Sequence, residues 1–199
     1  CSSDLVNYMR FKLRMGVSGR HCHLKREDMD ILFGKGSELH PIKPIVQPGQ
    51  FTCEEKIILV TDKGEMPLRV IGPLRPYTQI ELAKTDARQL GLNPPICFSG
   101  YLDGSLGGKI VGPEGEVILK EGIMLVQRHI HLCPETAAKY HLKNHDIVAM
   151  ETTGSRALRF EHVYVRTGPE HADEIHIDTD EGNACGLENG ALVDIVTRL

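Results

Sequence analysis

A five-residue signature occurs twice in this chain and constrains its fold more than any other feature. The copies are Arg20-His21-Cys22-His23-Leu24 and Arg128-His129-Ile130-His131-Leu132. Side chains at positions i and i+2 of a strand point to the same face of a sheet. Each copy therefore presents two imidazoles side by side, and imidazole is a common ligand of zinc, copper, iron and nickel. The duplication predicts two related halves whose equivalent positions meet about a pseudo-twofold axis.

The duplication also decides between two interpretations of the histidine pairs. A single His-x-His pair is more often a pair of half-buried strand histidines with backbone partners. Two copies in the same frame favour metal ligation for both pairs. Cys22 and Ile130 stand between the histidines and should face the opposite side, so Cys22 is expected to be a core thiol rather than a ligand.

The repeat continues beyond the histidine pairs. Gln79-Ile80-Glu81-Leu82 aligns with Glu174-Ile175-His176-Ile177, which places Glu81 on His176. Each half then supplies three metal-competent side chains, and three protein ligands with one open position are typical of catalytic zinc sites. The six candidate ligands are His21, His23, Glu81, His129, His131 and His176.

Two acidic residues that follow His176 allow two interpretations. Asp178 and Asp180 could accept hydrogen bonds from a ligating imidazole and so orient it. Alternatively, Asp180 could be the N-cap of a helix.

The pattern of short apolar runs indicates a mainly β fold with short helices. Turn-forming residues separate these runs, which favours small barrels or sandwiches over a doubly wound sheet. Strands are expected near 57–60, 68–71, 117–119, 123–126, 147–150 and 163–165, and helices near 26–33, 83–90 and 134–140.

Charge and composition exclude several classes of function. A net charge of −4 and the absence of long basic runs argue against a nucleic-acid partner. No apolar stretch approaches the roughly 18 residues that a membrane-spanning helix needs, so no membrane partner is expected. The six cysteines have no framework spacing, which predicts reduced thiols in a cytoplasmic compartment.

Arginines near these motifs suggest further roles. Arg75 lies between two prolines that stiffen its loop, which suits a bidentate grip on phosphate or carboxylate, although an exposed loop arginine is the commoner case. Arg20 and Arg128 should face away from the histidines and form structural ion pairs. The histidines outside the two motifs are expected at the surface, namely His40, His141, His145, His162 and His171.

The residues also resemble the PduL-type phosphotransacylases, or phosphate propanoyltransferases. The resemblance runs from about residue 15 to 187. It rests on Gly16-Val17-Ser18-x-Arg20-His21-x-His23-Leu24, Gln47-Pro48-Gly49-Gln50, Gly72-Pro73-Leu74-Arg75, Thr78-Gln79-x-Glu81, Thr85-Asp86-Ala87, Arg128-His129-Ile130-His131 and His176-Ile177-Asp178-Thr179-Asp180-Glu181.

This resemblance implies two similar β-barrels with short helical caps and a two-zinc active site between them. It implies interconversion of an acyl-CoA plus phosphate with acyl phosphate plus coenzyme A. We expect a short-chain acyl group and direct attack of phosphate on the thioester, without a covalent intermediate on the protein. The six candidate residues above would be the metal ligands and Arg75 would bind phosphate. Ser18 and Asn183 match positions near the bound coenzyme or metal. The family usually has Ser or Thr where this chain has Lys25 and Cys133, which removes a helix cap.

The domain boundaries expected from the repeat are an N-terminal segment 1–14, a first barrel 15–105 and a second barrel 106–199, with strand exchange between barrels left open. The resemblance also leaves open a homo-oligomer, a location inside a bacterial microcompartment and association with its shell. Two other functions remain as alternatives, a two-metal hydrolase of thioesters or phosphoesters and a non-catalytic metal-binding module. Cobalt, iron or manganese would also suit these ligands.

Overall fold

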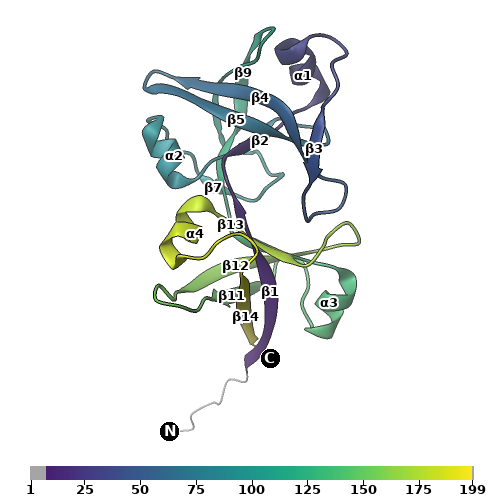
Figure 1. The fold of residues 1–199 in the computed structure, drawn as a ribbon, viewed down its shortest axis with the longest axis vertical. Coiled ribbons are helices and arrows are strands. Elements are labelled where there is room, and N and C mark those ends of the chain that lie inside the picture. The colour runs from purple at the N-terminus through teal and green to yellow at the C-terminus, as the bar shows by residue number, and fades with distance from the viewer. Residues whose placement is uncertain (1–7, 199) are drawn as a thin grey trace. The chain divides into compact units, whose positions relative to one another are not determined.

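The computed structural model describes residues 8–198, which divide into two units (Figure 1). One unit comprises residues 19–127. The other comprises residues 8–18 together with 128–198. Of the predicted N-terminal segment, residues 1–7 lie outside the described residues. Among residues 8–198, no helix is both long enough and apolar enough to cross a membrane.

Strands of two to 11 residues and two short helices make up the unit of residues 19–127. Its strands are β2 (His21–His23), β3 (Pro41–Pro44), β4 (Phe51–Thr61), β5 (Gly64–Gly72), β6 (Gln79–Glu81), β7 (Ile96–Cys97), β8 (Leu106–Val111) and β9 (Glu116–Val126). Its helices are α1 (Arg26–Phe33) and α2 (Lys84–Gln89).

The other unit has a similar make-up. Its strands are β1 (Tyr8–Ser18), β10 (His129–Leu132), β11 (Ile147–Glu151), β12 (Arg159–Thr167), β13 (Glu174–Asp178) and β14 (Leu192–Arg198). Its helices are α3 (Pro134–Lys139) and α4 (Thr179–Cys185).

Each unit contains a closed barrel, as the hairpin-rich sequence predicts. In one unit the strands close in the order β1-β13-β10-β12-β11-β14. In the other, β2 pairs with β5 and β6, β6 with β9, β9 with β8, β8 with β4, and β4 with β5, which also closes a ring. The described part of the chain is therefore mainly β with short helices.

The two barrels share one pairing scheme. β10 pairs in parallel with β12 and antiparallel with β13, just as β2 pairs in parallel with β5 and antiparallel with β6. The strand before each histidine pair joins the other half's barrel. β1 precedes β2 but pairs with β13 and β14, where it is the purple strand among yellow ones in Figure 1. β9 precedes β10 but pairs with β6 and β8.

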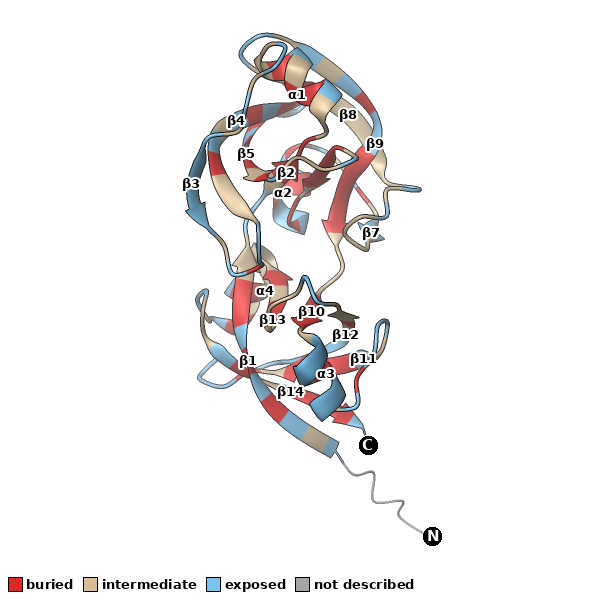
Figure 2. Cartoon of the chain, turned by 90° about the vertical axis from the view of Figure 1, so that its right-hand side faces the viewer, coloured by how far each residue is buried: buried red, intermediate tan, exposed pale blue. Residues whose placement is uncertain are grey.

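Alternation of apolar and polar residues places β1 in its barrel. Phe11, Leu13 and Met15 are buried, and the residues between them are exposed (Figure 2). Each unit has its own apolar core. Cys22 lies in one core and Ile130 in the other, both fully buried. The prediction that Cys22 is a core thiol is confirmed, and the histidines on either side of it face away from that core.

Loop residues cap the helices that follow the two histidine pairs. Within the described residues, neither Lys25 nor Cys133 caps its helix with its own side chain. The backbone N–H of Lys25 instead donates to Thr78 Oγ1 at 3.2 Å, and that of Cys133 donates to Asp173 Oδ1 at 2.7 Å. Thr78 and Asp173 immediately precede β6 and β13, so each cap ties a helix to the strand that carries the third candidate ligand.

Two local features differ from the sequence prediction. The runs at 117–119 and 123–126 belong to one strand, β9, which passes through Gly122 with a φ of 123°. Helix α4 was not among the three predicted helices, although one interpretation of Asp180 was a helix N-cap, and the N-cap is Asp178 instead. Asp178 and Glu181 form a reciprocal capping box, because each side chain accepts the other's backbone N–H.

Candidate metal centres

The first candidate centre consists of His21 and His23 on β2 and Glu81 on β6. β2 and β6 are antiparallel, and His21 lies opposite Glu81. The Nε2 atoms of His21 and His23 lie 3.5 Å and 3.9 Å from the Glu81 carboxylate oxygens. Two ligands of one tetrahedral zinc ion, each about 2.0–2.2 Å from it, are roughly 3.3–3.5 Å apart. The spacing of these three side chains therefore suits a shared ion.

Backbone carbonyls fix the tautomers of this histidine pair. His21 Nδ1 lies 2.8 Å from Gly19 O, and His23 Nδ1 lies 3.0 Å from Ile71 O. A carbonyl oxygen only accepts, so each Nδ1 carries the proton and each Nε2 keeps its lone pair for a ligand. Burial, the His21 ring and Arg75 hold the pKa of His23 well below its usual range. The neutral form of His23, which binds metal, therefore prevails at neutral pH.

Two further side chains hold the Glu81 carboxylate. The side-chain amide of Gln79 donates to Glu81 Oε1 at 2.6 Å, and Ser99 Oγ donates to the same oxygen at 3.2 Å. Gln79 is fully buried, and its own oxygen accepts the backbone N–H of Gly100 at 2.8 Å. The sequence had predicted no role for Gln79 or Ser99. The i, i+2 spacing of Gln79 and Glu81 on one strand was the signal available for the first of them.

Arg75 lies in the loop between β5 and β6, in the same unit as the first centre. Its backbone N–H donates to Leu24 O at 2.8 Å, which joins this loop to the residue after the histidine pair. Its half-buried guanidinium lies 3.4 Å from Gln50 Oε1. Its charge helps to lower the pKa of His23, as expected of a cation near the first centre.

The second candidate centre consists of His129 and His131 on β10 and His176 on β13. His176 lies opposite His129, the cross-strand position that Glu81 occupies opposite His21. Ring centroids are 4.8 Å apart for His129 and His131 and 5.1 Å apart for His129 and His176. One ligand atom from each of the three lies within 4.8 Å of the others.

The surroundings of His131 also indicate that the second centre can hold a metal ion. This side chain is buried, and neither of its ring nitrogens has a hydrogen-bond partner among residues 8–198. Burial, followed by the His129 and His176 rings, lowers its pKa far below the usual value. A buried polar atom without a partner costs about 1–3 kcal/mol, and a metal ion would remove that cost. Both donor sets match a divalent transition metal.

Comparison with known proteins identifies the family. A family model described as phosphate propanoyltransferase matches residues 14–188. The chain belongs to the phosphate propanoyltransferase family. It is 45% identical over 184 residues to the phosphate propanoyltransferase of Thermotoga maritima, which covers 92% of this chain and 88% of that protein. The enzyme of this name from Rhodopseudomonas palustris is 46% identical over 189 residues, or 94% of this chain and 84% of the relative. This member of the phosphate propanoyltransferases is therefore an acyltransferase of the phosphotransacylase type.

In this member of the phosphate propanoyltransferase family, one histidine lies at a position that differs from the prediction. His171 was expected at the surface, but its ring stacks on His131 with centroids 4.2 Å apart and planes 6° apart. The prediction for His171 is wrong, because its loop between β12 and β13 folds over the second centre. His40, His141, His145 and His162 are exposed, as predicted.

The two residues predicted near a coenzyme lie in the same unit as the second centre. Ser18 is the last residue of β1 and pairs with Asp178 of β13. Asn183 is exposed on α4. Their part in binding coenzyme stays a prediction.

The predicted ion pairs of Arg20 and Arg128 are confirmed. Arg20 Nη1 lies 2.8 Å from Asp86 Oδ1 on α2, and Arg128 Nε lies 2.5 Å from Glu181 Oε1 on α4. Each pair fixes a short helix to the start of a histidine strand. The repeat therefore extends to the contacts that support the centres.

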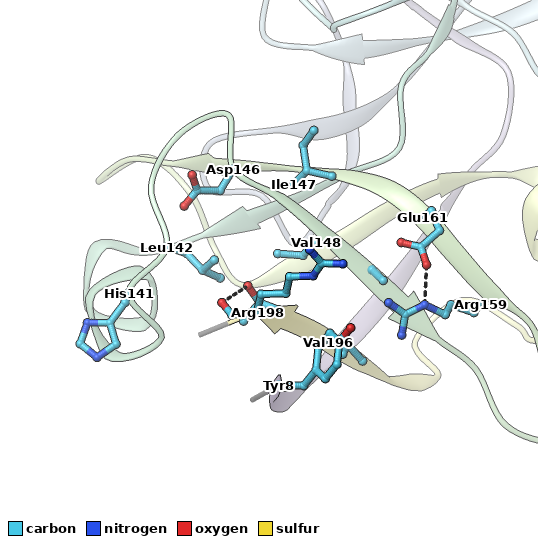
Figure 3. Close-up of a pocket in the computed structure, with 12 residues that line it drawn as sticks. Tyr8, His141, Leu142, Asp146, Ile147, Val148, Arg159, Glu161, Val196 and Arg198 are labelled. Carbon is cyan, nitrogen blue, oxygen red and sulfur yellow. Dashed lines mark hydrogen bonds and ion pairs between the residues drawn. The ribbon is translucent and has the colours of Figure 1, made fainter. Parts of the chain in front are cut away.

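A surface pocket of about 740 Å3 lies elsewhere on the unit of residues 8–18 and 128–198. It is lined by residues of β11, β12 and β14 with Tyr8 and His141, and Arg159 pairs there with Glu161 (Figure 3). None of the candidate ligands lines it.

Proposed function

We propose that this chain interconverts a short-chain acyl-CoA, propanoyl- or acetyl-CoA, plus inorganic phosphate with acyl phosphate plus coenzyme A. One observation carries the proposal beyond the family assignment. Two strand pairs with the same register each bring together three metal-competent side chains. Backbone carbonyls hold His21 and His23 in the tautomer that leaves Nε2 available to a metal ion.

Each group of three would hold one divalent ion, with zinc the first candidate for these ligands. The first ion would be bound by His21, His23 and Glu81. The second would be bound by His129, His131 and His176. When bound, the metal ions supply Lewis acidity, which polarises a thioester carbonyl and offsets phosphate charge.

Arg75 would bind the phosphate substrate. A guanidinium donates two parallel hydrogen bonds to a phosphate, and its charge offsets that of the anion. The backbone bond from Arg75 to Leu24 sets the position of the loop relative to the first centre. The contact of its guanidinium with Gln50 is long at 3.4 Å, so little is lost when it turns to a substrate.

The reaction needs no covalent intermediate on the protein. A phosphate oxygen attacks the thioester carbonyl carbon, the C–S bond breaks, and coenzyme A leaves as a thiolate. The core thiols are poor alternatives as nucleophiles, since burial raises the pKa of Cys22 far above its usual value and that of Cys53 to about 11.

One assay tests this function against its alternatives. Propanoyl-CoA and acetyl-CoA are supplied with and without phosphate, to enzyme as purified, after chelation and after zinc is returned. We expect acyl phosphate only with phosphate present, loss of activity on chelation and recovery with zinc. Thioester cleavage independent of phosphate would indicate a two-metal hydrolase. Absence of turnover, with metal that leaves only on unfolding, would indicate a structural metal module.

A further inference from the structure

Each candidate centre rests on a square of four side chains across two antiparallel strands. In the first square, His21 lies opposite Glu81 and His23 lies opposite Gln79. Three of these side chains are candidate ligands. The fourth, Gln79, supports the carboxylate ligand through its amide at 2.6 Å. The supporting position of this square thus holds a neutral side chain beside an acidic ligand.

The second square has the reverse arrangement. His129 lies opposite His176, and His131 lies opposite Glu174. All three candidate ligands here are histidines, and the carboxylate occupies the supporting position. Each square therefore contains one carboxylate. In the first centre it is the ligand Glu81, and in the second it is Glu174, which occupies the position equivalent to Gln79.

Glu174 is buried and touches the ligand beside it. Its Oε2 lies 2.8 Å from His176 Nε2, although that nitrogen has no aligned hydrogen bond among the described residues. Glu174 and His176 are two residues apart on β13, so both side chains lie on one face of the strand. The carboxylate thus has the position of a group that orients and polarises a ligating imidazole.

The neighbouring strand leaves space for this carboxylate. Gly16 of β1 pairs with His176, and a Cβ added at Gly16 would lie 3.0 Å from Glu174 Cδ and 3.1 Å from its Oε1. A side chain at Gly16 would therefore push the carboxylate aside. The glycine and the buried acid form one arrangement on adjacent strands.

We propose that Glu174 is the positioning residue of the second metal centre and supplies its negative charge through His176. The proposal rests on the proposed function, because it requires that His129, His131 and His176 hold an ion. With Glu174 included, both centres set one negative charge against a divalent cation. Carboxylates that contact a ligating imidazole in this way raise metal affinity about 10- to 100-fold.

The test isolates the second centre in the full-length chain. In a His21→Ala background the first centre lacks a ligand, so the tightly bound ion belongs to the second. Zinc affinity is measured by competition with a chelator, and the cobalt-loaded protein gives a visible absorption spectrum of the bound ion. Adding Glu174→Gln should weaken zinc binding about 10- to 100-fold and shift the cobalt spectrum. Gly16→Ala should act in the same direction by a smaller factor.

Two controls separate this role from a purely structural one. Glu135→Gln changes an exposed glutamate of α3 and should leave zinc affinity unchanged. The metal-free Glu174→Gln protein should give the circular dichroism of its folded parent, so that a loss of zinc affinity reports on the centre and not on folding. Unchanged zinc affinity in Glu174→Gln would overturn the proposal alone. A His21→Ala protein without any tightly bound zinc would overturn the two-metal function and this proposal with it.

Discussion

The side-chain amide of Gln79 lies 2.6 Å from Oε1 of Glu81, the one carboxylate among the six candidate ligands. This bond and the one from Ser99 fix the direction in which Glu81 presents its oxygens to the histidine pair. A metal centre depends on such supporting contacts as well as on its ligands.

Loss of the amide donor should weaken the first centre. Gln79→Ala leaves Glu81 with one fewer donor and a void beside it, so we expect metal affinity to fall about 10- to 100-fold in a protein whose second centre is removed by His129→Ala. Chelator competition measures the change. Gln89→Ala, an exposed glutamine of α2, is the matched control. Equal affinity in the Gln79 and Gln89 variants would contradict a supporting role.

Arg75→Ala should impair the use of phosphate. Hydrogen bonds to a charged group contribute about 1.5–3 kcal/mol, which corresponds to a rise of roughly tenfold or more in the KM for phosphate. Metal content should not change, since Arg75 is not a ligand. Arg75→Lys keeps the charge without the planar fork and should fall between. Steady-state kinetics with varied phosphate check this, with exposed Arg88→Ala as control. Unaltered phosphate kinetics in Arg75→Ala would refute the assignment.

The core thiols should resist alkylation. Burial is the main cause that raises the pKa of Cys22 and Cys53, the latter to about 11, so both remain protonated at pH 7 and at pH 9. The thiolate is the reactive form, and raising the pH across this interval should therefore not expose either residue to iodoacetamide. Mass spectrometry of native and denatured protein gives the labelled positions. Rapid native labelling of Cys22 would show that it is not a core thiol.

The contacts of Glu181 should stabilise the fold independently of metal. Glu181 pairs with Arg128 and completes the capping box of α4. Glu181→Gln should lower the free energy of unfolding by about 1–2 kcal/mol, from a partly exposed ion pair and a weakened cap. Urea unfolding of metal-free protein measures this, and exposed Glu188→Gln should change little. A Glu181 variant as stable as the Glu188 variant would contradict a stabilising role for the ion pair and the capping box.

The features of the structure that the sequence predicts are mainly those that occur in both halves of the repeat. Local patterns indicate the barrels, and the alignment of the two halves selects both groups of three side chains and the ion pairs of Arg20 and Arg128. The exchange of β1 and β9 leaves no such trace, because a strand's apolar alternation shows that it has a buried face but not which barrel it joins.

The supporting residues were missed for a related reason. Ser99 and His171 lie in loops, and their roles depend on where the fold returns those loops rather than on a spacing in the sequence. Helix α4 carried a signal in its capping box, since Asp178 and Glu181 have the required three-residue spacing.

Metal stoichiometry tests the central claim most directly. Elemental analysis of the purified chain should find two divalent ions per molecule, one in His21→Ala and one in His129→Ala, and none tightly bound when both substitutions are combined. All four proteins should show the circular dichroism of a folded β protein. A single ion in the parent chain, or a count that neither substitution changes, would contradict the assignment of one ion to each group of three ligands.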